Sequence, residues 1–150
     1  MAASPHVMIV EARFYPDIAD ELAKGATAAL DKAGASYERF TVPGVLEIPA
    51  AINMAIQAAI KVKRRPFDAY LALGCVIRGE TTHYDIVCNE SARGVQELIL
   101  KHDLALGFGV LTVENDEQAW ERAHVNRKNK GGEAAEACLA MYELKRNLGL

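Results

Sequence analysis

The stretch Gly74-Cys75-Val76-Ile77-Arg78-Gly79-Glu80-Thr81-Thr82-His83-Tyr84-Asp85 decides the fold of this chain. The apolar run before it, residues 70–73, predicts a strand that is buried on both faces. After Asp85 the apolar residues recur at helical spacing, with Thr82 and Asp85 at the N-cap and N3 positions of a capping-box variant. A strand, a glycine-containing turn and a helix N-terminus leave backbone N–H groups unpaired, which favours binding of an anion at this turn.

The rest of the chain repeats this pattern of a strand followed by a helix. Further strands are predicted at residues 6–12, 37–42 and 105–113. Strands that alternate with helices predict right-handed crossovers and a parallel sheet. The expected fold class is therefore α/β: a three-layer α/β/α, flavodoxin-like domain over residues 1–150, with a four-stranded parallel sheet and helices on both faces.

The predicted helices carry their own boundary signals. Pro16 and Pro49 each suit a first helical turn, and the run 115–118 is typical of a capping box. A basic run at residues 61–65 ends the second helix. The apolar faces expected to pack on the sheet are Ile52, Ile56 and Ile60 in the second helix, and Ala134, Ala137/Cys138, Met141, Leu144 and Leu148 in the last.

Composition excludes several classes of protein. The chain has 150 residues, 51% of them apolar and 25% charged, with a net charge of -3, which is typical of a soluble globular protein and leaves no basic surface for nucleic acid or an anionic membrane. No apolar segment is long enough to span a bilayer, and residues 1–5 show no signal-peptide pattern. Cys75, Cys88 and Cys138 show no paired spacing, so we expect reduced thiols and a cytoplasmic location.

The predicted topology brings distant segments together at one end of the sheet. In open α/β sheets, ligands bind beyond the carboxyl ends of the strands. That rule places Phe14, residues 44–47, residues 75–83 and Glu114 on one rim. Because a sheet of four strands has exposed edges, we also expect at least one edge to be covered by a partner subunit.

His83 is the histidine expected in a functional loop. An imidazole transfers protons near neutral pH, although a surface histidine beside a well-capped turn is the ordinary alternative. Phe14, Arg122 and Lys130 likewise have ordinary interpretations, as a core aromatic and as solvated cations. The scattered histidines give no metal-ligand spacing, and the glycines match neither a dinucleotide fingerprint nor a phosphate-binding loop, so no metal or cofactor is expected.

The stretch at residues 74–85 resembles the Gly-Thr-Val-Ile-Arg-Gly segment, ending in Thr-Thr-His-Tyr-Asp, of the lumazine synthases. The resemblance extends from about His6 to the C-terminus. Arg13-Phe14 is similar to that family's Arg-Phe-Asn, and residues 43–49 are similar to its Pro-Gly-Ala-Phe-Glu-Ile-Pro. Cys75 stands where the family has threonine.

What the resemblance implies about the site is specific. His83 corresponds to the proton-transfer histidine. The pyrimidine substrate would contact Phe14, Val45, Leu46, Glu47, Cys75, Val76, Ile77 and Phe108. The phosphate substrate would contact Glu80, Thr81, Arg122 and Lys130, the first two through backbone amides. Phe108, Arg122 and Lys130 would complete a site on the neighbouring subunit.

The implied activity is that of a cofactor-independent transferase in riboflavin biosynthesis. It condenses 5-amino-6-(D-ribitylamino)uracil with 3,4-dihydroxy-2-butanone 4-phosphate and releases phosphate and two waters. A binding protein that holds lumazine or riboflavin without turnover is the alternative. Thr81, His83 and Arg122 together favour the enzyme, because a flavin carrier has no need of a phosphate half-site.

The resemblance also implies a homo-oligomer, a ring of five with active sites shared between adjacent subunits, and admits riboflavin synthase as a partner protein. Some relatives dock twelve rings into a shell through a glycine-containing loop between the last two helices. Here the loop is residues 124–129 and has no glycine, so a position needing φ > 0 is expected to be strained. Arg127 and Lys128 are also expected to repel their symmetry mates. We therefore expect a free pentamer.

Overall fold

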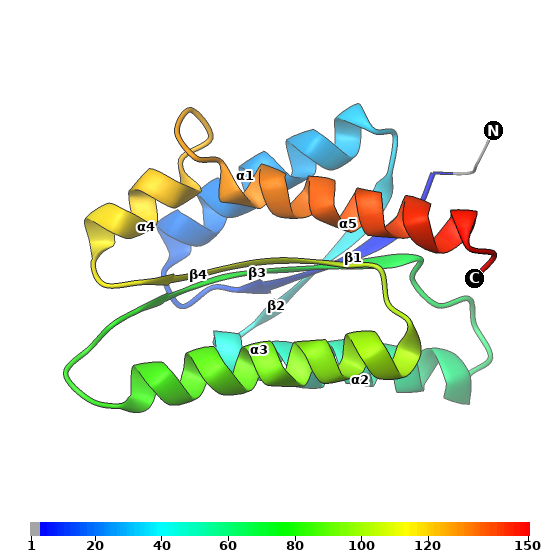
Figure 1. The fold of residues 1–150 in the computed structure, drawn as a ribbon, viewed down its shortest axis with the longest axis horizontal. Coiled ribbons are helices and arrows are strands. Elements are labelled where there is room, and N and C mark those ends of the chain that lie inside the picture. The colour runs from blue at the N-terminus through cyan, green and yellow to red at the C-terminus, as the bar shows by residue number, and fades with distance from the viewer. Residues whose placement is uncertain (1–3) are drawn as a thin grey trace.

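The predicted strands form one parallel sheet in the computed structural model, which describes residues 4–150 (Figure 1). The strands are β1 (His6–Ala12), β2 (Ser36–Val42), β3 (Ala69–Ile77) and β4 (Leu106–Val113), and their order across the sheet is β2-β1-β3-β4. The predicted four-stranded parallel sheet is confirmed. The pattern of residues 1–5, which lacks signal-peptide features, falls partly on residues 1–3, which lie outside the described residues.

Helices cover both faces of the sheet, so the predicted three-layer, flavodoxin-like architecture is also confirmed (Figure 1). One face carries α1 (Pro16–Lys32), α4 (Asp116–Ala123) and α5 (Lys130–Asn147). The other face carries α2 (Ile48–Lys61) and α3 (His83–His102), with a short 3-10 turn, η1 (Val45–Glu47), leading into α2. Within residues 4–150 no helix is long and apolar enough to cross a membrane.

The core lies on both faces of the two central strands. Residues of β1 and β3 alternate between a cluster under α1 and α5 and a cluster under α2 and α3, and almost every one is buried. Gly107 lets α5 approach β4 closely, because a Cβ there would lie 2.0 Å from the carbonyl oxygen of Ala134. The continuous apolar runs predicted for these strands therefore reflect burial on both sides.

Three details differ from the sequence prediction. β3 continues to Ile77, so Cys75, Val76 and Ile77 belong to the strand rather than to the turn after it. Ile60 is exposed, and Ala59 instead continues the buried side of α2 that Ile52 and Ile56 begin. In α5 Met141, Leu144 and Leu148, which were predicted to pack on the sheet, are exposed. The buried face runs instead through Ala134, Ala135 and Cys138 toward Leu139 and Tyr142. Apolar residues occupy both sides of α5, so periodicity alone did not identify the packed side.

A buried carboxylate joins β1 to β2 on the face that α1 covers, and the sequence analysis did not find it. Glu11 is 1% exposed. Arg39 of β2 donates to it through Nε at 2.6 Å and through Nη2 at 2.9 Å. Arg13 also donates to Glu11, at 3.3 Å, and to Asp20 of α1 at 2.6 Å. The bidentate pair satisfies a charge that would be costly to bury alone.

Replacement of Glu11 by glutamine is expected to lower the free energy of unfolding by about 1–3 kcal/mol, because two guanidinium groups lose their carboxylate partner. Urea unfolding measures the change. Glu38→Gln is the control, because Glu38 is exposed on β2 and its ion pair is with His6, at 2.8 Å. The control should change stability by less than about 0.5 kcal/mol. Equal losses in the two variants would contradict a special role for the buried carboxylate.

Candidate active site

A cavity of about 410 Å³, the rim cavity, opens beyond the carboxyl ends of the strands. Phe14 after β1, η1 after β2, the end of β3 and the start of α3 form its walls. Segments remote in sequence therefore meet where the topology rule predicted. Of the predicted site residues, the rim cavity is lined by Phe14, Val45, Leu46, Glu47, Cys75, Val76, Ile77, Thr81 and His83.

The wall formed by η1 depends on a glycine in β3. A Cβ at Gly74 would lie 2.7 Å from Cγ2 of Val45 and 3.1 Å from Cβ of Ala12. Without it, Val45 is buried against the sheet, and Leu46 and Glu47 are left exposed beside the cavity. Phe14 lies opposite, 68% exposed, with its ring edge-on to Tyr15 at a centroid distance of 5.0 Å. Its free face can stack on a flat ligand.

The N-terminus of α3 provides donors for an anion. The backbone N–H of His83 donates to Oγ1 of Thr81 at 3.3 Å. Thr82 is the N-cap residue, as predicted, but its side chain makes no capping bond, so the predicted capping box is wrong. In residues 4–150 the backbone N–H groups of Glu80, Thr81 and Thr82 have no hydrogen-bond partner. Free N–H groups ahead of a 20-residue helix favour a bound anion.

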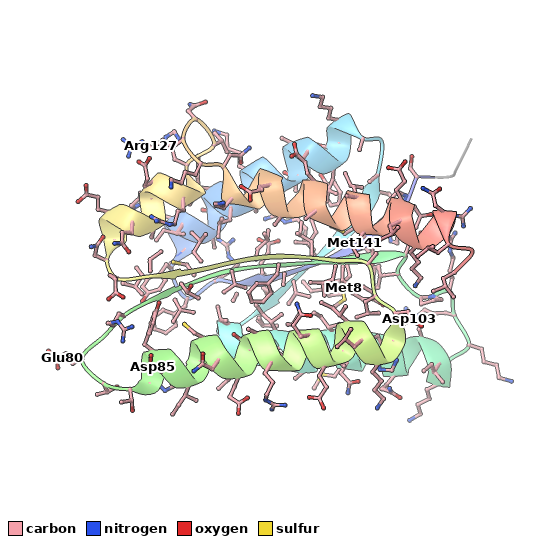
Figure 2. All side chains as sticks on the ribbon, in the orientation of Figure 1. Met8, Glu80, Asp85, Asp103, Arg127 and Met141 are labelled. Atoms are coloured by element: carbon pink, nitrogen blue, oxygen red, sulfur yellow. The ribbon has the colours of Figure 1, made fainter. Side chains whose placement is uncertain are left out.

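Glu80 lies at the tip of this loop, and its side chain extends away from the body of the protein (Figure 2). It lines neither this cavity nor the next one described. An outward carboxylate avoids repulsion of a bound phosphate. The group that Glu80 can offer to a ligand is thus its backbone N–H.

The other predicted residues lie in a second cavity of about 320 Å³, the edge cavity, beside the edge strand β4. Phe108 of β4, Arg122 of α4 and Lys130 of α5 line it. Arg122 donates to the carbonyl oxygen of Gln118 at 3.1 Å and has no carboxylate partner in the described part of the chain. Lys130 pairs with Glu133 at 2.9 Å. The less engaged Arg122 is therefore the better candidate to bind an anion.

The two cavities share no lining residue in the described chain, so one subunit holds the predicted site as two separate halves. A model of the 6,7-dimethyl-8-ribityllumazine synthase family matches residues 4–146. A protein named 6,7-dimethyl-8-ribityllumazine synthase from Bartonella tribocorum is 58% identical over 99% of this chain and 95% of its own length. The protein of that name from Agrobacterium fabrum is 56% identical over 98% and 99%.

The chain belongs to the 6,7-dimethyl-8-ribityllumazine synthase family. The resemblance first drawn from residues 74–85 is confirmed along nearly the whole chain. Among residues 4–150 there is no cluster of metal-ligating side chains. In this lumazine synthase family member, the side chains and backbone groups that line the two cavities are candidates for its chemistry.

Two tyrosines that the sequence analysis did not single out also line the rim cavity. Tyr15 follows Phe14, and Tyr84 follows His83. Burial raises the pKa of both phenols above the ordinary value, so both stay neutral hydrogen-bonding groups at physiological pH. Each tyrosine directly follows a predicted site residue in the sequence, and this adjacency was the signal by which both could have been predicted.

The loop before α5 has one residue with a positive φ and one paired arginine. Among its described residues only Asn129 has a positive φ, 44°, and asparagine tolerates this conformation better than most residues. Arg127, at the loop in Figure 2, pairs with Glu121 of the same subunit at 2.9 Å. One asparagine therefore carries the predicted positive φ, and a carboxylate of α4 pairs with Arg127.

Cys75 is expected to be chemically inert. Burial raises the pKa of its thiol to about 12, so it stays protonated at neutral and mildly alkaline pH. Iodoacetamide should leave Cys75 unmodified in the folded protein at about pH 8.5 and modify it after unfolding, as peptide mass spectrometry would show. Cys75→Thr should keep the wild-type pH–rate profile. Labelling of Cys75 in the folded protein would contradict this account.

Proposed function

We propose that this protein catalyses the condensation of 5-amino-6-(D-ribitylamino)uracil with 3,4-dihydroxy-2-butanone 4-phosphate to give 6,7-dimethyl-8-ribityllumazine, phosphate and two waters. Family membership supports the reaction, and the division of the predicted site into two halves is the observation that carries it. The rim cavity suits a flat pyrimidine, and the N-terminus of α3 beside it provides the first part of a phosphate site. The edge cavity adds an aromatic ring and the less engaged arginine.

The rim cavity suits the pyrimidine half of the reaction. The exposed face of Phe14 stacks on the ring, and the backbone of Val45 and Leu46 with the carboxylate of Glu47 binds polar groups of the ring and the ribityl chain. Cys75, Val76 and Ile77 are at the carboxyl end of β3, past the last residue that pairs with β1 and still paired with β4, and they line the rim cavity. These contacts orient the amine that attacks the ketone.

The phosphate half combines the N-terminus of α3 with Arg122 of a neighbouring subunit. The N–H groups of Glu80 and Thr81 and the helix dipole stabilise the phosphate, and the guanidinium fork of Arg122 fits two of its oxygens. Lys130 adds charge after release from Glu133. His83, in the rim cavity, carries protons as the carbinolamine loses water and as the ring closes.

A ring of five subunits brings the two halves together in this proposal. β4 is an edge of the sheet, with Phe108 exposed on it, and α4 and α5 lie beside it (Figure 1). An interface at this edge covers β4 and places the edge cavity against a neighbour's rim cavity. The same proposal includes a single domain and a location in the cytoplasm, where Cys75, Cys88 and Cys138 stay free thiols. It also includes riboflavin synthase as the enzyme that consumes the product.

The direct test mixes the protein with both substrates and follows the absorbance of the lumazine product. We expect acceleration well above the uncatalysed background, because orientation of two bound reactants supplies much of the rate. A protein that binds the product tightly but gives only the background rate would instead be a carrier. Heat-inactivated protein is the control.

Complementation tests the shared site. His83→Ala should slow turnover about 10- to 100-fold, and Arg122→Gln should weaken use of the phosphate substrate. The two variants are co-expressed with different tags and purified through both tags. They should regain about a quarter of wild-type activity, because random mixing leaves about a quarter of the interfaces with both an intact His83 and an intact Arg122. No gain over the average of the separate variants would contradict a shared site.

Light scattering on the wild type and on the mixed variants is the control for assembly. Each sample should give about five chain masses, each of 16.3 kDa. A particle of megadalton size would contradict the free ring while leaving the shared site intact.

A further inference from the structure

The loop between β3 and α3, residues 78–82, has few attachments beyond its first residue. In the described chain, residues 79–82 hydrogen-bond only within the loop and to the first turn of α3. Their bonds are from His83 N to Thr81 Oγ1 and from the N–H groups of Asp85 and Ile86 to the carbonyl oxygen of Thr82. The start of α3 is therefore held against the sheet by residues outside 79–82, among them Tyr84, whose hydroxyl is hydrogen-bonded to the side chain of Thr112 in β4.

Arg78 is at the junction of β3, β4 and α3. Its backbone N–H donates to the carbonyl oxygen of Val113 at 2.9 Å, which extends the pairing of the two strands by one residue. Its side chain donates through Nε to Oε2 of Glu114 at 2.7 Å. The guanidinium carbon lies 4.2 Å from the ring centroid of Tyr84, and Nη1 lies 3.8 Å from Oδ1 of Asp85.

The anchor on the β4 side is itself held in place. The backbone N–H of Glu114 donates to Oε1 of Gln118 at 2.8 Å. The backbone N–H of Gln118 donates in turn to the N-cap side chain of Asn115 at 2.9 Å. The capped end of α4 thus fixes the backbone of Glu114, whose carboxylate Arg78 contacts.

Arg78 does not line the rim cavity, although both its neighbours, Ile77 and Gly79, do. It does not line the edge cavity either. Its fork is directed to Glu114 and to the face of Tyr84, rather than to the space in which a ligand would bind. Its effect on a ligand is therefore indirect.

We propose that Arg78 is a positioning residue, which holds the first turn of α3 against the end of β4 and so sets where Thr81 and His83 meet the phosphate-bearing substrate. This inference rests on the proposed function. A lysine keeps the charge but loses both the fork and the flat surface that stacks on Tyr84. Small displacements of reacting groups are costly in a site that works by orientation.

The test compares Arg78→Met, Arg78→Lys and Glu114→Gln with the wild type. Arg78→Met should raise KM for the phosphate substrate about 5- to 20-fold and lower kcat about 10-fold, with pyrimidine affinity within about twofold. Arg78→Lys should be intermediate. Glu114→Gln should reproduce the direction of the Arg78→Met defect, although it leaves the arginine charge in place.

Hydrogen exchange measured by mass spectrometry gives a readout that does not depend on turnover. Amides of residues 79–86 should exchange faster in Arg78→Met and Glu114→Gln, with Tm within about 2 °C of the wild type. Arg93→Met is the matched control. Arg93, like Arg78, is an exposed arginine paired with carboxylates, here Glu90 and Glu97, but it lies within α3 and away from the cavities. It should leave kinetics and loop exchange unchanged.

Three results would overturn the inference. The first is wild-type kinetics and loop exchange in Arg78→Met. The second is a normal Glu114→Gln beside an impaired Arg78→Met, which would mean that Arg78 contacts the substrate itself. The third is a fall in Tm with equal loss of both substrates, which would make Arg78 merely structural. Failure of the wild-type turnover assay would refute the proposed function. Hydrogen exchange of residues 79–86 would still test whether Arg78 holds the first turn of α3 in place.

Discussion

The parallel pairing of β1 with β3 is the constraint on which the rest of the structure depends. Its register aligns Val7 with Ala69 and Glu11 with Leu73, and both strands are buried on both faces. The next residues along, Ala12 and Gly74, then lie side by side at the carboxyl end. Phe14 and the loop of His83 follow directly from these two strands, so the pairing that fills the core also determines where the walls of the rim cavity meet.

The edge of the sheet places a second constraint on the protein. β1 and β3 each have a strand on both sides, whereas β4 has one neighbour and exposes Phe108 beside a cavity. An unpaired edge is a liability unless another surface covers it. In the proposed ring the covering surface is a neighbour's rim cavity, so the same contact that protects the edge completes the site.

The sequence was enough to predict the layers, the strand count and most residues of the rim cavity, because those follow from buried apolar runs, from helical spacing and from the carboxyl-end rule. It placed Glu114 on the same rim, whereas that carboxylate pairs with Arg78 and does not line the cavity. It did not reveal Glu11, because a single charge in an apolar strand shows no periodicity and its partner Arg39 is remote in the chain. It also missed the role of Arg78, whose partners Glu114 and Tyr84 come from two other elements. Contacts across elements were the part that local pattern could not supply.

The chemistry of the site is consistent with this architecture. The cysteine in the rim cavity is neutral, with a pKa raised to about 12 by burial. The two cavities also present a stacking ring, backbone donors, a histidine and cations, groups that orient and neutralise rather than form covalent bonds. A site of this kind is only as precise as the elements that carry its parts. If half of the site residues come from a neighbouring subunit, the subunit interface must be as well ordered as a protein core. A change that weakens assembly would then also weaken catalysis.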